Sequence, residues 1–286
     1  MRVILSGGGT GGHIYPAVAI GQAIKKKWPE AEILYIGTEK GLESKIVPQA
    51  GFNMQSIDVV GWQREISVQA LCAAWKTMKS IRQASKYIRK FAPDLVVGTG
   101  GYVCLPVVWA AARQGIPTVL HEQNAMPGLT NKILARKANY VLLTFPEAAR
   151  RFPDIAQGKI RVTGLPVRPQ ILNIGRAEGL AYFGFADNLP VLLTVGGSRG
   201  AKSINTAMLE LYRTIQEERI PLQVIHLTGQ TGFEQVKEQL RQAGIDLANC
   251  GNIIIKPYLH EMEYALACAD LCVGRAGAAF LSEMTA

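Results

Sequence analysis

The amino-acid sequence predicts an α/β protein with two Rossmann-like domains in series, each built on a parallel sheet. Three observations lead to this prediction. Short apolar segments alternate with longer amphipathic segments, which is the rhythm of a parallel sheet covered by helices. Glycine-rich turns directly follow four of the predicted strands. A segment with two prolines, Leu165 to Pro169, interrupts the rhythm within the 286-residue chain, because proline fixes its own backbone and lacks an N–H donor.

The first predicted domain spans residues 1–165. Its strands are expected at Val3–Ser6, Ile33–Ile36, Asp94–Gly98, Thr118–His121, Tyr140–Thr144 and Arg161–Gly164. The second predicted domain spans residues 166–286. Its strands are expected at Val191–Val195, Gln223–Leu227, Asn252–Ile255 and Leu271–Val273, and its helices include Ala201–Gln216 and Phe233–Gln242. The last helix begins only a few residues before Ala286 and no capping glycine follows it, so we expect this domain to be incomplete.

Composition excludes several classes of protein. Hydrophobic residues make up 48% of the chain, which is enough for a core in each domain. The longest uninterrupted apolar run, Val103 to Ala112, is much shorter than the about 20 residues that a membrane-spanning helix needs. The N-terminus lacks the pattern of a secretory signal, so we expect the protein to stay in the cytoplasm. The five cysteines form no CxxC motif and predict neither a disulfide framework nor a metal site.

The net charge of +9 is distributed unevenly along the chain. Residues 1–150 hold 18 Lys and Arg against 9 Asp and Glu, whereas residues 151–286 hold 13 of each kind. This asymmetry predicts an anionic partner for the first half, which could be nucleic acid, a membrane surface or a phosphorylated ligand. No motif for reading nucleic acid accompanies the charge, so we expect no nucleic-acid partner.

The four glycine-rich turns predict a ligand that carries phosphate. They occupy residues 7–12, 98–101, 196–200 and 274–277, two in each domain. In open α/β sheets, ligands bind beyond the carboxyl ends of the strands. Glycine lets a ligand approach backbone N–H groups, and the N-terminus of the following helix favours a phosphate. The alternative is that the glycines only make tight turns between strands and helices.

Two of these turns also match motifs of other enzyme classes. Residues 7–12 fit GxGxxG, but a dinucleotide site needs an acidic residue at the end of the second strand, and the nearest acid is Glu39. Residues 196–200 fit the GxSxG motif with Ser198 as a nucleophile. An esterase would then need a later Asp and His, and only Asp246 and His260 occur in that order. We therefore favour neither a nicotinamide or flavin enzyme nor a hydrolase.

Six longer segments resemble a known family in both sequence and order. They are GGGTGGH (7–13), GTGGYVCLP (98–106), HEQNAMPGLTNK (121–132), GLPVR (164–168), GGSRGA (196–201) and GRAGAAFLSE (274–283). Together they resemble the MurG family of peptidoglycan N-acetylglucosaminyltransferases, in glycosyltransferase family 28. The resemblance implies the GT-B architecture, in which two Rossmann-like domains with parallel sheets face each other across a cleft.

The resemblance also implies a reaction and its partners. Family members transfer GlcNAc with inversion from UDP-GlcNAc to the 4-hydroxyl of undecaprenyl-diphosphate-linked MurNAc-pentapeptide, which converts lipid I to lipid II in peptidoglycan synthesis and so serves cell shape and division. No metal and no other cofactor is implied. The alternative is a non-catalytic module that binds a nucleotide sugar or a lipid diphosphate.

Site residues follow from the same resemblance. An inverting transferase needs a general base for the acceptor hydroxyl, and His13 matches that position, with Glu122 as the competing candidate. The residues implied on the acceptor side are Gly9, Thr10, Gly101, Tyr102 and Asn124. The residues implied in donor binding are Thr10, Gly11, Gly12, Asn124, Arg168, Ser198, Leu259, Ala278, Ala279, Phe280, Leu281, Ser282 and Glu283.

A helix over residues 68–91 would have two different faces at about 100° per residue. The face suited to the domain core carries Ile81, Ala84, Ile88 and Phe91. The roughly opposite face carries Val68, Leu71, Trp75 and Met78, followed by Lys79, Arg82, Lys86 and Arg89. An apolar patch beside a basic stripe is typical of peripheral proteins on anionic bilayers, although a solvated basic face would look the same. The lipid-linked substrate favours membrane contact through Leu71, Trp75, Met78, Lys79 and Arg82, at the cytoplasmic face of the cell membrane.

Overall fold

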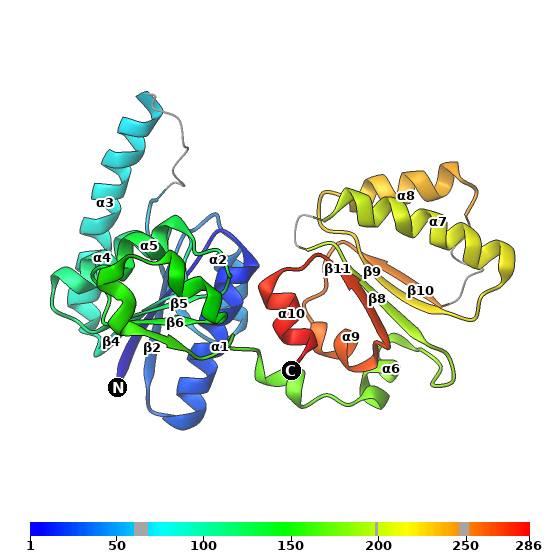
Figure 1. Cartoon of the computed structure of the whole chain (residues 1–286), viewed down its shortest axis with the longest axis horizontal. Helices are drawn as coiled ribbons and strands as arrows, with labels where there is room; N and C mark the ends of the chain where they lie inside the picture. The colour runs from blue at the N-terminus through cyan, green and yellow to red at the C-terminus, as the bar shows by residue number, and fades with distance from the viewer. Residues whose placement is uncertain (60–67, 198–199, 246–251) are drawn as a thin grey trace. The chain divides into compact units, whose positions relative to one another are not determined.

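The computed structural model describes residues 1–59, 68–197, 200–245 and 252–286, with the backbone alone for residues 68–76 and 155 (Figure 1). The chain divides into two compact units, Met1–Arg168 and Pro169–Ala286. The division falls inside the proline-containing segment from which the sequence boundary was predicted. Neither unit contains, in its described part, a helix long and apolar enough to cross a membrane.

The N-terminal unit is built on a seven-stranded parallel sheet with strand order β3-β2-β1-β4-β5-β6-β7. Its strands are β1 (Arg2–Ser6), β2 (Glu32–Gly37), β3 (Asn53–Ser56), β4 (Leu95–Gly98), β5 (Thr118–Glu122), β6 (Tyr140–Leu143) and β7 (Ile160–Val162). The strand order reverses at β1, which pairs with β2 on one side and β4 on the other. A reversal of this kind opens a ligand-binding crevice at the carboxyl ends of the neighbouring strands.

Helices cover both faces of this sheet (Figure 1). They are α1 (Gly11–Lys27), α2 (Glu43–Gln49), α3 (Val68–Phe91), α4 (Cys104–Arg113) and α5 (Leu129–Ala135), with 3-10 helices η1 (Pro146–Arg151) and η2 (Asp154–Lys159). Alternation along β1 divides the core, because successive side chains of a strand point to opposite faces. Ile4 packs in the cluster that contains residues of α3 and α4, while Val3 and Leu5 pack in the cluster that contains residues of α1 and α2.

The C-terminal unit has a four-stranded parallel sheet with strand order β10-β9-β8-β11. Its strands are β8 (Val191–Val195), β9 (Gln223–Leu227), β10 (Ile253–Lys256) and β11 (Leu271–Gly274). Its helices are α6 (Arg176–Phe183), α7 (Lys202–Glu218), α8 (Phe233–Gln242), α9 (Met262–Cys268) and α10 (Ala278–Met284), preceded by the 3-10 helix η3 (Pro169–Leu172). Two core clusters, one with residues of α7 and α8 and one with residues of α6 and α9, enclose the sheet.

The predicted α/β class with parallel sheets is confirmed, and each predicted strand has a counterpart. Two local differences have physical reasons. The strand expected at 161–164 begins at Ile160 and ends at Val162, and Gly164 has the left-handed φ of 76° that turns the chain away. Strand β3 was not predicted, because its sequence NMQS is polar and lacks β-branched residues. It lies at the sheet edge, where exposed polar side chains are tolerated.

Candidate active site

The first two glycine turns lie together at the carboxyl ends of β1 and β4. Thr99, which follows β4, donates its Oγ1 hydrogen to the carbonyl of His13 at 2.6 Å, and its backbone N–H to Ser6 at 2.9 Å. A Cβ atom placed on Gly101 would overlap the carbonyl oxygen of Gly8. Gly101 also has a φ of 80°, which side chains of L-residues rarely adopt. The two turns therefore approach each other backbone to backbone, and glycine is required for that contact.

A tyrosine from β2 fixes the start of the first turn. Tyr35 is fully buried and its hydroxyl donates to the carbonyl of Gly7 at 2.7 Å. Burial raises the pKa of Tyr35, so the hydroxyl keeps its proton and remains a donor. Beside it, Glu43 accepts from the N–H and the hydroxyl of Thr38 at 3.0 and 2.6 Å, and this closes the turn after β2. Neither Tyr35 nor Glu43 was singled out by the sequence motifs.

His13 lies in the first turn of α1, at the junction of these loops, and is half-buried. Its Nδ1 atom is 3.0 Å from the carbonyl oxygen of Thr99 and 3.1 Å from Oε1 of Gln123. A carbonyl oxygen can only accept, so Nδ1 carries the hydrogen. In the neutral ring, Nε2 then has the free lone pair.

Glu122 ends β5 and is 1% exposed. Four donors surround its carboxylate. Oε1 accepts from the backbone N–H and the side-chain Nδ2 of Asn124 at 3.0 and 3.1 Å. Oε2 accepts from the N–H of Gly128 at 3.1 Å and from Nδ2 of Asn131 at 2.8 Å. The carboxylate therefore holds the loop from Asn124 to Gly128 in one conformation.

The residues implied on the acceptor side surround the first helix terminus. Thr10 is exposed and occupies the N-cap position of α1 without a side-chain capping bond, followed by Gly11 and Gly12 in the first helical turn, which contains no acidic residue. A Cβ atom on Gly9 would lie 3.1 Å from Cε1 of Tyr102, so the Tyr102 ring borders the turn. Asn124 is exposed and lies on the loop held by Glu122. The structure thus brings this set together at one edge of the sheet.

The residues implied in donor binding belong mainly to the C-terminal unit. Residues 278–283 lie on α10, which follows the glycine turn after β11. Since β11 pairs with β8, this turn and the turn at 196–200 follow neighbouring parallel strands. Leu259 is 3% exposed and packs in the core, so its side chain faces away from solvent. Ser198 lies outside the described residues.

Arg168 is the last residue of the N-terminal unit. Its guanidinium lies 4.9 Å from the centre of the Tyr15 ring, a cation–π distance. This contact ties the end of the unit to α1, the helix that carries His13.

A buried polar network in the C-terminal unit lies beside Gly200, the last residue of its first glycine turn. Tyr212 donates its hydroxyl hydrogen to Nδ1 of His226 at 2.8 Å, and Nε2 of His226 donates to Oδ1 of Asn205 at 3.1 Å. Asn205 in turn donates to the carbonyl of Thr228 at 3.1 Å. Burial lowers the pKa of His226 to about 4, so the ring is neutral near pH 7. The network ends at the carbonyl oxygen of Thr228. A Cβ atom on Gly200 would overlap this oxygen, so glycine is required there.

From residue 77 onward, where its side chains are described, α3 divides its faces as the pattern predicted, and the predicted outer-face residue Val68 lies outside that part. Ala84 and Ile88 are fully buried, and Ile81 and Phe91 pack against the same cluster. Met78 is 59% exposed, and Lys79, 3.9 Å from Asp58, forms a solvent-exposed ion pair. Arg82, Lys86 and Arg89 are exposed. The side chains of Leu71 and Trp75 lie outside the described residues.

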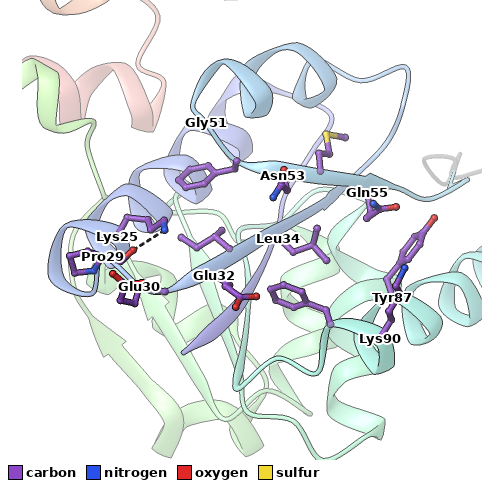
Figure 2. Close-up of a pocket in the computed structure, with 15 residues that line it drawn as sticks. Lys25, Pro29, Glu30, Glu32, Leu34, Gly51, Asn53, Gln55, Tyr87 and Lys90 are labelled. Atoms are coloured by element: carbon purple, nitrogen blue, oxygen red, sulfur yellow. Dashed lines mark hydrogen bonds between the residues drawn. The ribbon is translucent and has the colours of Figure 1, made fainter.

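A surface pocket of about 730 Å³ lies elsewhere, at the β3 edge of the sheet (Figure 2). The first residues of β2, the end of α1 near Lys25 and the end of α3 near Lys90 line it, so it is separate from the turns at the carboxyl ends of the strands. In the described part of the chain, no cluster of three or more His, Cys, Asp or Glu could hold a metal ion.

Comparisons with known proteins cover both units. Residues 3–143 match the family model of the glycosyltransferase family 28 N-terminal domain, and residues 191–286 match that of the C-terminal domain. Proteins of Desulforamulus reducens and Moorella thermoacetica are each 50% identical over 286 residues, which is 100% of this chain and 76% of theirs. Both are described as "UDP-N-acetylglucosamine--N-acetylmuramyl-(pentapeptide) pyrophosphoryl-undecaprenol N-acetylglucosamine transferase".

Solved structures share the fold. The crystal structure of Acinetobacter baumannii MurG is 30% identical, with a TM-score of 0.64 over 97% of this chain and 74% of that chain. The S. aureus MnaA structure with UDP has a TM-score of 0.65 over 97% of this chain and 75% of its own, but is 15% identical and shows the fold alone. These neighbours confirm the two-domain GT-B class of fold expected from the sequence.

Proposed function

The chain belongs to glycosyltransferase family 28, and from this we infer that it transfers N-acetylglucosamine from UDP-N-acetylglucosamine to lipid I, which forms lipid II in peptidoglycan synthesis. The observation that carries this conclusion is the similarity of 44–50% identity over essentially the whole chain to relatives that carry the name of this transferase. The protein is therefore an N-acetylglucosaminyltransferase.

We propose that His13 is the general base. Its Nδ1–H donates to the carbonyl of Thr99, which leaves the Nε2 lone pair for the proton of the acceptor hydroxyl. As Nε2 takes that proton, the hydroxyl oxygen forms a bond to the anomeric carbon of the donor sugar. The bond from this carbon to the diphosphate breaks in the same step, and UDP leaves with the electron pair. A single displacement of this kind inverts the anomeric centre.

Glu122 is better suited to holding the acceptor loop than to taking the proton. Its two carboxylate oxygens accept from four donors, and its side chain is 1% exposed. A base must reach the substrate proton, and these donors occupy the oxygens that would do so. The geometry therefore favours His13 of the two candidates.

The acceptor diphosphate fits the first two glycine turns. The N-terminus of a helix favours an anion, and the first turn of α1 has no carboxylate to repel one. Thr10 and Asn124 are exposed at this edge and can donate to phosphate oxygens. We assign the donor to the C-terminal unit, where a carboxylate at Glu283 on α10 suits a ribose diol and Ser198 of the same unit is proposed to contact the diphosphate.

Membrane contact is the final element of the proposal. The face of α3 that carries Met78 and Arg82 is exposed, and the N-terminal unit carries the excess positive charge of the chain. A lipid-linked acceptor must be taken from a bilayer surface, and exposed apolar and basic side chains bind such a surface. We therefore propose peripheral binding at the cytoplasmic face of the membrane.

A direct assay tests the function. Radiolabelled GlcNAc from UDP-GlcNAc should appear in a short-chain lipid I analogue when the protein is present. Binding of UDP-GlcNAc, measured by calorimetry in the same preparation, separates the two functions considered. Binding without transfer to a competent acceptor would replace the transferase assignment with a non-catalytic nucleotide-sugar module.

A further inference from the structure

A series of hydrogen bonds leads to His13 from a second, buried histidine, His121. His121 lies on β5 and is fully buried, and its Nε2 atom is 3.0 Å from the carbonyl oxygen of Gly164. Because a carbonyl oxygen only accepts, Nε2 carries the hydrogen. Burial lowers the pKa of His121, so its ring is neutral and Nδ1 is left as an acceptor.

Gln123 connects this ring to His13. The amide Nε2 of Gln123 is 3.1 Å from Nδ1 of His121 and 3.1 Å from the backbone oxygen of His121. Both of these atoms are acceptors, so the NH₂ group of the amide must point at them. The amide oxygen of Gln123 then points the other way, to Nδ1 of His13 at 3.1 Å.

The chain of donors and acceptors has one consistent assignment. It runs from Gly164 O through His121 and Gln123 to Nδ1 of His13, where the Thr99 carbonyl is a second acceptor at 3.0 Å. Rotating the Gln123 amide by 180° would set its NH₂ group against the N–H of His13 and its oxygen against two acceptors. Gln123 is 2% exposed, so water could not repair those contacts.

We propose that Gln123 and His121 are positioning residues, which hold the imidazole of His13 with its hydrogen on Nδ1 and its lone pair on Nε2. The series of hydrogen bonds starts at the backbone carbonyl of Gly164, two residues after the end of β7. The effect on transfer rests on the proposed role of His13 as the base. The position of the hydrogen on the His13 ring does not depend on that role, because it can be observed without substrate.

The test is nitrogen-15 NMR of ring nitrogens in histidine-labelled protein, which has only 4 histidines to assign. In the unmodified protein, Nδ1 of His13 should carry the hydrogen. In Gln123→Met, the Thr99 carbonyl is the one acceptor left at Nδ1 of His13, so the Nδ1–H form should remain the major one but a minor population with the hydrogen on Nε2 should appear. The value of kcat should fall about tenfold because a buried hydrogen bond to the base is lost, and the Kd for UDP-GlcNAc should stay the same. In Gln123→Glu, one carboxylate oxygen still accepts from Nδ1 of His13, so the Nδ1–H form should persist. The negative charge beside the ring favours its protonated form, so the acidic limb of the rate–pH profile should move to higher pH. The other carboxylate oxygen replaces an NH₂ group that faces two acceptors of His121, so this variant should be less stable than the unmodified protein.

The control is Gln114→Met, the same substitution at the half-buried glutamine that follows the last residue of α4, outside these hydrogen bonds, which should change neither readout. The ring of His226 serves as an internal control for intact structure. A hydrogen on Nε2 of His13 in the unmodified protein, or an unchanged ring and kcat in Gln123→Met, would overturn the proposal. Should Gln123→Met shift the tautomer while His13→Gln retains full transfer, the positioning role would stand and the base assignment would fail.

Discussion

Each unit contains a buried histidine within a hydrogen-bond network, but the two networks end at different groups. His121 on β5 and His226 on β9 are both fully buried, and burial lowers the pKa of each. Each bonds to a side-chain amide, of Gln123 in the N-terminal unit and of Asn205 in the C-terminal unit. The first chain ends on a half-buried imidazole, and the second ends on the backbone carbonyl of Thr228.

The difference suggests a proposal for each network: the first orients the proposed base, and the second fixes backbone geometry. A neutral buried histidine offers one donor and one acceptor in fixed directions, so it orients whatever amide it contacts. In the N-terminal unit that amide orients a second titratable ring, and in the C-terminal unit it fixes a turn. Substitutions along the first chain should therefore change rate, and substitutions along the second should change stability.

The largest effect is expected at the end of the first chain. His13→Gln removes the Nε2 lone pair to which we assign the acceptor proton, so kcat should fall about 10²- to 10⁴-fold. Steady-state transfer assays measure this change. The UDP-GlcNAc Kd and the melting temperature should remain as they were, since the side chain is half-buried and its neighbour Thr99 keeps its own bonds. If His13→Gln lowered the melting temperature as much as substitutions in the C-terminal network do, the proposed difference between the two networks would be contradicted.

Next in size is His226→Leu in the second chain. It leaves the Tyr212 hydroxyl and Oδ1 of Asn205 buried without the hydrogen bonds to His226, which should lower the free energy of unfolding by about 2–4 kcal/mol. Amide hydrogen exchange in β9 reports this unit specifically. Tyr212→Phe removes only one donor and should have a smaller effect. If His226→Leu slowed transfer by folded protein and left exchange unchanged, the contrast between the units would be lost.

The pH dependence of stability should follow the same network. The pKa of His226 is about 4 in the folded unit and about 6.5 in an unfolded chain. Between these values the unfolded state binds the additional proton, so stability falls as pH falls from about 6.5 to 4, by about 2–3 kcal/mol. Carboxylates also titrate there, so the relevant quantity is the difference in slope between the unmodified protein and His226→Leu. Equal slopes would contradict the prediction.

The smallest effect concerns the surface charge that distinguishes the units. Arg82→Gln on α3 should weaken binding to vesicles with anionic lipid about fivefold, because one basic residue near the surface contributes about 1 kcal/mol. Sedimentation with neutral vesicles should show no change. Lys237→Gln, an exposed cation of the C-terminal unit, is the matched control. Equal effects of the two substitutions would remove the membrane role from α3.

The fold could be predicted further than the site. Short apolar segments between longer amphipathic ones identified most of the strands, and the period of α3 correctly placed Ala84 and Ile88 in the core, because burial requires apolar side chains at those positions. Strand β3 was not predicted, because a strand at the sheet edge can form without apolar residues. The motifs contained Gln123, Thr99 and Asn131, yet spacing could not show which atoms meet. Those bonds join β4, β5, α1 and α5, and only the folded sheet brings them within reach.

The contact between Gly8 and Gly101 has a consequence for how this chain can change over generations. A methyl group at position 101 would meet a backbone oxygen, which cannot rotate aside as a side chain can. Gly51 has a similar φ of 81° but nothing lies within 4 Å of its missing Cβ, so asparagine could drift in there. Substitutions of the two glycines should therefore be tolerated differently during evolution. Position 51 can accept other residues directly, whereas position 101 can change only after the backbone of the opposing loop at Gly8 has changed conformation.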